Sequence, residues 1–149
     1  LMSTLKEKLL EDMKIAMKQK DKQRLAVIRM ARASIKNVEI DSRKDLTDDE
    51  IIDILTKEVK QRRDAIPEYE KAGKMDRVKM LEEEMDILSD YLPRQLTREE
   101  IESLVDEVIA QTNAESMRDM GKVMGAIMPK VKGRADGKIV NQIVKQKLS

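Results

Sequence analysis

Glycine, proline and basic residues gather between residues 120 and 137, in the segment MGKVMGAIMPKVKGRADG. This segment holds four of the chain's five glycines and one of its three prolines, whereas the rest of the chain is rich in helix-forming residues. Bare glycine backbone allows close approach and basic side chains neutralise phosphate, so this pattern could bind a sugar–phosphate backbone. The basic residues in and beside the segment are Arg118, Lys122, Lys130, Lys132, Arg134 and Lys138.

Helix geometry relates the glycines to these cations. At about 100° per residue, Gly121 lies at the edge of an apolar face, and Gly125 and Pro129 lie farther round, among the basic residues. A proline ring collides with the carbonyl four residues earlier, so Gly125 would ease the backbone adjustment at Pro129. The apolar face consists of Met117, Met120, Met124, Ile127, Met128 and Val131. We expect this methionine stripe to fill the core, with an adaptable binding groove as the alternative.

Each interior helical glycine costs about 1 kcal/mol relative to alanine, so two explanations compete. In the first, Gly121 and Gly125 let another helix pack closely, and Gly133 and Gly137 are C-cap and loop residues. In the second, the strip admits a phosphate backbone; Asp136 caps the next helix, and Arg134 and Lys138 lie near its positive end. The spacing leaves both explanations open.

Enzymatic chemistry has little support in the residue types. The chain has no His and no Cys, which excludes zinc sites, thiol nucleophiles and imidazole acid–base catalysis within it. GKVMG lacks the phosphate-loop pattern, and no histidine is present to activate a serine. The acidic run at residues 82–86 points in several directions around a helix and is interpreted as a solvated face. The sequence therefore predicts no catalytic residue, no metal ligand set and no cofactor.

Periodic apolar residues and capping signals predict an all-α fold and no sheet. Thr4 and Glu7 form a capping box that opens a first helix to about residue 20. Pro67 is expected to kink or end the third helix, and Gly73 to terminate it. The expected helices span about residues 4–20, 21–41, 47–73, 75–88, 97–111, 117–132 and 137–148, with the linker TNAES at residues 112–116. Their expected core faces include Met17 and Val38.

The segment YLPRQL is the best candidate for a domain boundary, because Pro93 disfavours helix and Thr97 begins a new one. We predict a four-helix N-terminal domain over residues 1–92 and a three-helix C-terminal domain over 93–149. Charge supports this division: residues 117–149 carry eight basic and two acidic side chains, whereas residues 1–92 carry 20 and 21.

A second basic cluster lies within residues 14–36, which hold eight Lys or Arg and one acidic residue. Arg29, Arg32 and Lys36 share one helix face and could extend a phosphate-binding surface. The alternative is that both basic clusters are ordinary solvated faces. No apolar run reaches the roughly 20 residues of a membrane span, and no signal peptide is evident. We therefore expect a cytoplasmic protein with no membrane partner.

The glycine-rich segment and its flanks, SMRDMGKVMGAIMPKVKGRADGKIVNQIVKQKLS, resemble the signature of the GatB/YqeY family. Three other blocks, VIRMARASIKNVEID, KQRRDAIPEYEKAGKMDRV and LSDYLPRQLTREEI, resemble the free-standing YqeY-like proteins. The resemblance covers essentially the whole chain.

The resemblance implies a relation to the B subunit of the glutamine-dependent tRNA amidotransferase, a carbon–nitrogen ligase with glutamine as amido donor. In that enzyme, the similar region is a helical tail that contacts the tRNA body, whereas ATP-dependent activation and glutamine hydrolysis belong to other parts. The resemblance thus implies a role in translation in which this chain supplies the non-catalytic part.

Three functions follow as hypotheses. The first is recognition of tRNA or another structured RNA by shape and phosphate, since two tyrosines cannot build a base-stacking platform. The second is a protein-interaction adaptor that docks on amidotransferase subunits or another translation factor through the methionine-bearing helix. The third is a stand-alone amide-forming enzyme.

Overall fold

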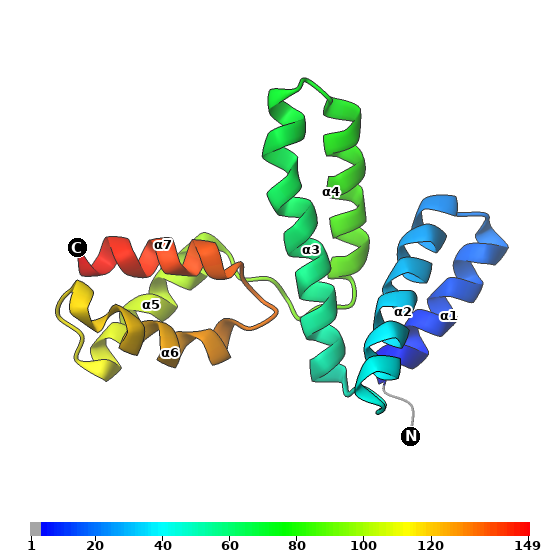
Figure 1. Ribbon diagram of the computed structural model, residues 1–149. Coiled ribbons are helices and arrows are strands. Elements are labelled where there is room, and N and C mark those ends of the chain that lie inside the picture. Colours follow the sequence, from blue (N-terminus) through cyan, green and yellow to red (C-terminus); the bar gives the residue numbers. More distant parts are fainter. Residues whose placement is uncertain (1–3) are drawn as a thin grey trace. The chain divides into compact units, whose positions relative to one another are not determined.

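The computed structural model describes residues 4–149, which form seven α-helices and one short 3-10 helix, with no strand in that range (Figure 1). The prediction of an all-α fold is confirmed. The helices are α1 (Thr4–Gln19), α2 (Lys22–Ser42), α3 (Asp48–Lys71), α4 (Met75–Ser89), α5 (Arg98–Thr112), η1 (Met117–Asp119), α6 (Met120–Val131) and α7 (Gly137–Leu148).

The chain divides into two compact units, residues 1–92 and 93–149. The first unit contains α1 to α4 and the second contains α5 to α7. Each unit has its own cluster of buried apolar side chains, so each has the core that an independently folding domain requires.

The first unit consists of two helical hairpins. α1 lies beside α2, α3 lies beside α4, and the two pairs also contact each other (Figure 1). Leu9, Ile28, Ile51, Leu55 and Leu88, which come from all four helices, are fully buried in its core. The buried positions recur at helical spacing, so the local pattern and the packing agree.

Polar contacts near the helix ends link the two hairpins. The Leu5 N–H donates to Asp48 Oδ1 at 3.1 Å, which joins the first turn of α1 to the first residue of α3. The Tyr91 hydroxyl donates to Asp12 Oδ2 at 2.6 Å, and burial raises the pKa of that tyrosine. α1 begins at Thr4, in agreement with the expected helix over about residues 4–20.

Two local predictions need correction in this unit, and a third is settled in part. α3 continues through Pro67 to Lys71, so of the kink or end expected at this proline the end is excluded. Gly73, at φ +71°, lies in the turn that follows α3, as expected of a residue that terminates a helix. Met17 and Val38 are exposed, at 49% and 39%, although the helical period assigns them to core faces. Periodicity predicts which residues share a face, but the neighbouring helix decides how much of that face is covered.

The second unit is a three-helix bundle in which α5, α6 and α7 all contact one another. Thr97 caps α5 with a reciprocal capping box to Glu100, as the sequence predicts. Glu100 also receives two hydrogen bonds from the Arg94 guanidinium at 2.8 and 2.9 Å. These bonds from Arg94, with help from the Thr97 N–H, lower the pKa of Glu100 to about 2.

None of the helices in the described residues is both long and apolar enough to cross a membrane.

Candidate functional site

Helix α6 turns one face fully into the core of its unit. Val123, Ile127 and Val131, spaced four residues apart, are completely buried against α5 and α7. Residues two positions away from these lie about 200° round the helix, on the opposite side. The burial of this one face therefore determines that Gly121, Gly125 and Pro129 face outward, and all three are exposed.

The two outward glycines have open space above them. A Cβ atom built on Gly121 or Gly125 would meet nothing within 4 Å. No helix of the described chain packs closely on either glycine, so the first explanation offered by the sequence does not account for them. What remains is a strip of bare helical backbone on the surface.

Basic side chains border this strip. Arg118, Lys122 and Lys132 are exposed beside it, and Lys132 follows the last residue of α6. Lys130 is also exposed, but it lies about 140° round the helix from Gly125 and so does not border the strip. Within residues 4–149, no ion pair is formed by Arg118, Lys122 or Lys130. Their positive charges are therefore available to a ligand in solution.

One carboxylate lies at the start of the strip. Asp119 Oδ2 accepts a hydrogen bond from the Glu115 N–H at 2.9 Å, and this bond is the main reason that the pKa of Asp119 is lowered. The positive charges of Arg118 and Lys122 lower it further. Asp119 is thus an ionised group that partly offsets the local positive charge, and sequence reasoning had not included it in the site.

The loop after α6 is held in shape by the segment that precedes α5. Gly133 has a left-handed backbone, at φ +73°, as expected of a residue that ends a helix. Its carbonyl accepts from Gln95 Nε2 at 2.8 Å, and the carbonyl of Arg134 accepts from the Leu96 N–H at 2.8 Å. Sequence reasoning missed this bracing because the partners lie 38 residues apart.

Arg134 has a structural contact in addition to its candidate role. Its Nε donates to the Arg94 carbonyl at 3.1 Å, which leaves the other guanidinium nitrogens for a ligand. Lys130 and Lys138 are exposed, and Lys138 lies in the first turn of α7.

The N-terminus of α7 carries the predicted cap. Asp136 Oδ1 accepts from the Lys138 N–H at 3.0 Å, which confirms the cap. The same carboxylate places negative charge at the helix end, so this end attracts an anion less than a free N-terminus does. Gly137 is the first residue of α7, not a loop residue, and a Cβ there would make only an ordinary contact, 3.6 Å from Met128 Cε.

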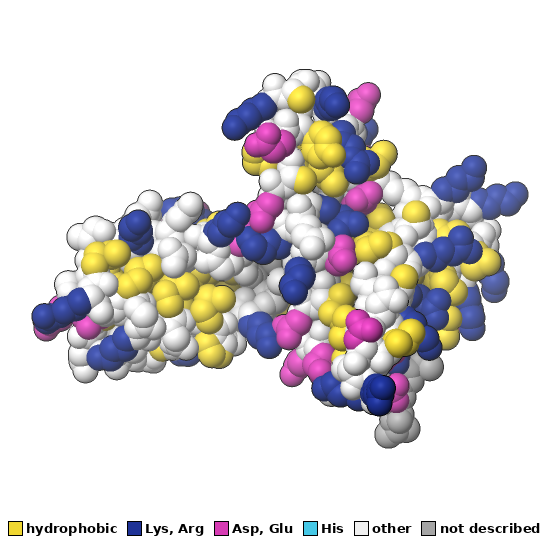
Figure 2. Space-filling view, in the orientation of Figure 1, with side chains coloured by type: hydrophobic (Ala, Val, Ile, Leu, Met, Phe, Trp, Pro, Cys, Tyr) yellow, Lys and Arg dark blue, Asp and Glu magenta, His cyan; other side chains and the backbone are white. Residues whose placement is uncertain are grey.

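The methionine stripe is only partly core. Met120 and Met124 pack against the core of the unit, whereas Met117 and Met128 are 39% and 36% exposed. The fully buried Val123 was missed, because the methionines defined a face that is rotated from the true one. Figure 2 shows hydrophobic side chains reaching the surface in a row on this unit.

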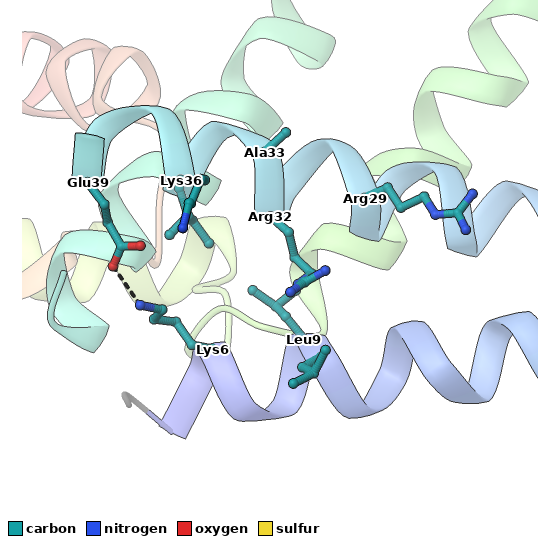
Figure 3. Close-up of a pocket in the computed structure, with 9 residues that line it drawn as sticks. Lys6, Leu9, Arg29, Arg32, Ala33, Lys36 and Glu39 are labelled. Atoms are coloured by element: carbon teal, nitrogen blue, oxygen red, sulfur yellow. Dashed lines mark hydrogen bonds and ion pairs between the residues drawn. The ribbon is translucent and has the colours of Figure 1, made fainter. Parts of the chain in front are cut away.

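The second basic face lies beside a groove between α1 and α2. The groove has a volume of about 460 Å³, and Arg29, Arg32 and Lys36 are among the residues that line it (Figure 3). The structure adds Lys6 and Glu39, which lie 33 residues apart in the sequence and form an ion pair of 2.6 Å. This ion pair, together with the Leu46 N–H, lowers the pKa of Glu39.

Taken together, the chain is an all-α protein of two compact units, with a basic, glycine-bearing helix face on one unit and a cation-lined groove on the other. A comparison with protein families matches residues 6–148 to the family described as Yqey-like protein. The chain belongs to this family, which confirms the resemblance stated above.

Curated relatives carry the name "Altered inheritance of mitochondria protein 41, mitochondrial". The Kluyveromyces lactis protein is 39% identical over 97 residues, which cover 62% of this chain and 52% of the relative. The Lachancea thermotolerans protein is 40% identical over 83 residues, which cover 55% of this chain and 44% of the relative. The chain therefore spans about half the length of the curated relatives it matches.

The names of these relatives overturn one prediction. The expectation of a cytoplasmic location is wrong, because these relatives and a third, from Eremothecium gossypii, are all named as mitochondrial proteins. Location depends on signals that a folded domain need not contain, and composition does not report it.

Proposed function

We propose that this chain binds structured RNA, with tRNA as the first candidate, through the outer face of α6 and the loop that follows it. The observation that carries the proposal is the open space above Gly121 and Gly125, since these glycines weaken the helix and no packing within the described chain requires them. A bound phosphate backbone would make use of the close approach that they allow.

Charge supports an anionic ligand at this face. Residues 117–149 carry eight basic and two acidic side chains, and Arg118 and Lys122, beside the glycines, are exposed without ion pairs among the described residues. Lysine and arginine contacts to phosphate supply affinity and orientation without reading sequence. In this proposal Lys132, Arg134 and Lys138 extend the same surface toward the start of α7.

The two tyrosines support recognition by shape, not by base stacking. Tyr91 is buried and donates to Asp12, so its ring is not available to a base. Tyr69 lies under the Arg77 guanidinium, 5.6 Å from the ring centroid. Single-strand readers present several exposed aromatic rings, whereas duplex readers use the minor groove and the backbone. We infer that the ligand is a folded, double-helical part of an RNA.

The proposal gives no residue of this chain a catalytic role. Relation to the amidotransferase tail would make the chain an accessory that binds RNA while the ligase chemistry is performed elsewhere. The stand-alone enzyme is the least supported hypothesis, and glutamine-dependent amide formation by the purified chain would establish it.

A protein-docking role is the second candidate, because Met117 and Met128 present apolar surface beside the basic strip. Exposed methionines adapt to partner surfaces of varied shape. Association with an amidotransferase subunit or another translation factor that survives RNase treatment would favour this role over RNA binding.

The direct test is binding of fluorescently labelled tRNA to the full chain at low salt, measured by anisotropy. We expect Lys122→Ala to weaken binding roughly five- to tenfold at about 0.1 M salt, which is the contribution of one phosphate contact. Lys145→Ala is the matched control: it removes an exposed lysine from the same unit, on α7. Equal effects of the two substitutions, or no binding of tRNA, would reject the proposed surface.

A further inference from the structure

The groove between α1 and α2 combines an apolar lining with cationic side chains. Leu9, Leu10, Ala33 and Ile35 supply the apolar lining, and the groove has a volume of about 460 Å³. Arg32 extends from α2 toward α1, where Leu9 lies (Figure 3). The Lys6–Glu39 ion pair joins the two helices farther along α2, on the side away from Arg29. In Figure 2, Lys and Arg side chains gather over α1 and α2.

The groove continues along α2. A second hollow, of about 380 Å³, shares Lys36 and Glu39 with the first and adds Ile40, Arg43, Lys44 and Asp45 to the lining. Lys44 is paired with Glu50 at 2.7 Å, so Arg43 is the cation that this hollow adds. From residue 29 to residue 43 the helix advances about 21 Å, at 1.5 Å per residue. We call this face of α2, from Arg29 to Arg43, the cationic stripe. Ile40 is 62% exposed, so the cationic stripe presents an apolar side chain between its cations.

Within the part of the chain that the structure describes, the Arg32 guanidinium has no carboxylate partner. Its Nη1 donates to Met13 Sδ at 3.1 Å, and a thioether is only a weak acceptor. No ion pair is formed by Arg29, Arg32 or Lys36 within residues 4–149. Arg32 is also partly buried, and a partly buried guanidinium binds a carboxylate strongly because solvent screens the pair less.

We propose that this groove is a docking site for an acidic amphipathic segment of a partner protein, whose carboxylates meet Arg29, Arg32 and Lys36 and whose apolar side chains pack on Leu10 and Ile40. This site lies in the residue 1–92 unit and is separate from the proposed RNA surface, so either can fail without the other. An acidic helix of about 14 residues would span the cationic stripe, as in other helix-in-groove complexes.

Two features favour a peptide over RNA here. A phosphate backbone has no use for the apolar lining or for the exposed Ile40, whereas an amphipathic helix buries both kinds of surface. In addition, Lys6 and the Leu46 N–H hold the Glu39 carboxylate ionised beside Lys36, and this carboxylate would repel a nearby phosphate. A peptide can place an uncharged residue at that point.

The test uses a fluorescein-labelled peptide of about 14 residues, with Glu and Leu at helical spacing, and anisotropy with the full chain. We expect binding, and we expect the double substitution Arg29→Glu and Lys36→Glu to weaken it at least about tenfold, since two attractions become repulsions. The matched control is Lys57→Glu with Lys74→Glu, which changes the same charge at exposed positions outside the groove. A peptide with Gln in place of Glu should not bind measurably.

A second pair of variants tests the apolar contact. Ile40→Ser should weaken binding about threefold or more, because it removes apolar area that the peptide would cover. Val38→Ser should change nothing, since Val38 is also exposed on α2 but does not line the groove. Both residues are on the surface, so the fold should survive, and circular dichroism checks this.

Three results would overturn the proposal. The first is absence of binding by the acidic peptide, and the second is equal loss in the Lys57 and Lys74 control. The third is tRNA affinity that falls with Arg29→Glu and Lys36→Glu but not with Lys122→Ala, which would make the groove an RNA surface and would also reject the α6 site.

Discussion

Replacing Gly125 by alanine should stabilise the α5–α7 unit. The Cβ atom would enter open space, so the only large effect is that of helix propensity, about 1 kcal/mol in favour of alanine at an interior helix position. For a unit of this size, that corresponds to a rise in the melting temperature of roughly 4–8 °C. Hydrogen exchange of the α5–α7 amides in the full chain measures this unit separately from α1–α4.

Gly133→Ala is the matched control for this substitution. Gly133 is buried and has φ +73°, a backbone conformation that alanine adopts only with strain. We expect this variant to lose about 1 kcal/mol of stability, so the same chemical change has opposite signs at the two glycines.

The result that would refute the reasoning is a loss of stability in Gly125→Ala. It would mean that the backbone at this position needs glycine, and the adjustment at Pro129 would then be the cause. In that case the loss should disappear in a Pro129→Ala background, because coupled residues give non-additive effects. Additive effects would exclude the coupling.

Substitutions of Gly125 also allow the stability of the unit and its affinity for tRNA to be tested separately. If the strip admits a phosphate backbone, Gly125→Leu should weaken tRNA binding while the unit stays folded. Because the substitution removes no charge, the salt dependence of binding should not change. Unchanged tRNA affinity in Gly125→Leu would mean that the glycines serve some other purpose.

Three further outcomes are expected. If about four phosphates are contacted, the logarithm of tRNA affinity should fall with the logarithm of salt concentration with a slope of about −3 to −4. Lys122→Ala should reduce the magnitude of that slope by about one. A slope that no basic substitution changes would contradict this expectation. Limited proteolysis of the full chain should cut first within residues 92–95 or 42–47. Residues 92–95 connect two units that each have a core, so a cut there leaves both cores intact. Early cleavage inside helix α5 would contradict this expectation. Glu100→Gln should lower the melting temperature at pH 7, because the folded-state pKa of Glu100, about 2, lies below its ordinary value. The difference in melting temperature from the unsubstituted chain should shrink as pH falls from about 4.5 to about 2. A difference that does not depend on pH would contradict this reasoning.

The sequence by itself determined the features that depend on neighbours within a few positions. The capping box of Thr97 and Glu100, the cap at Asp136 and the left-handed Gly133 all follow from local hydrogen bonding and backbone preference. For the same reason the helices lie close to where apolar periodicity predicts them, and the cations that flank the glycine strip could be named in advance.

Only the tertiary structure decided which surfaces are open and which distant residues meet. Periodicity suggested that Met117 and Met128 face the core, but packing against α5 and α7 rotates α6 so that Val123 takes that place. The Lys6–Glu39 ion pair and the bracing of Arg134 by Arg94 join residues 33 and 40 positions apart. A helical pattern records which side chains share a face and not which partner covers it. These contacts, and the groove that the Lys6–Glu39 pair lines, therefore exist only once the helices have packed.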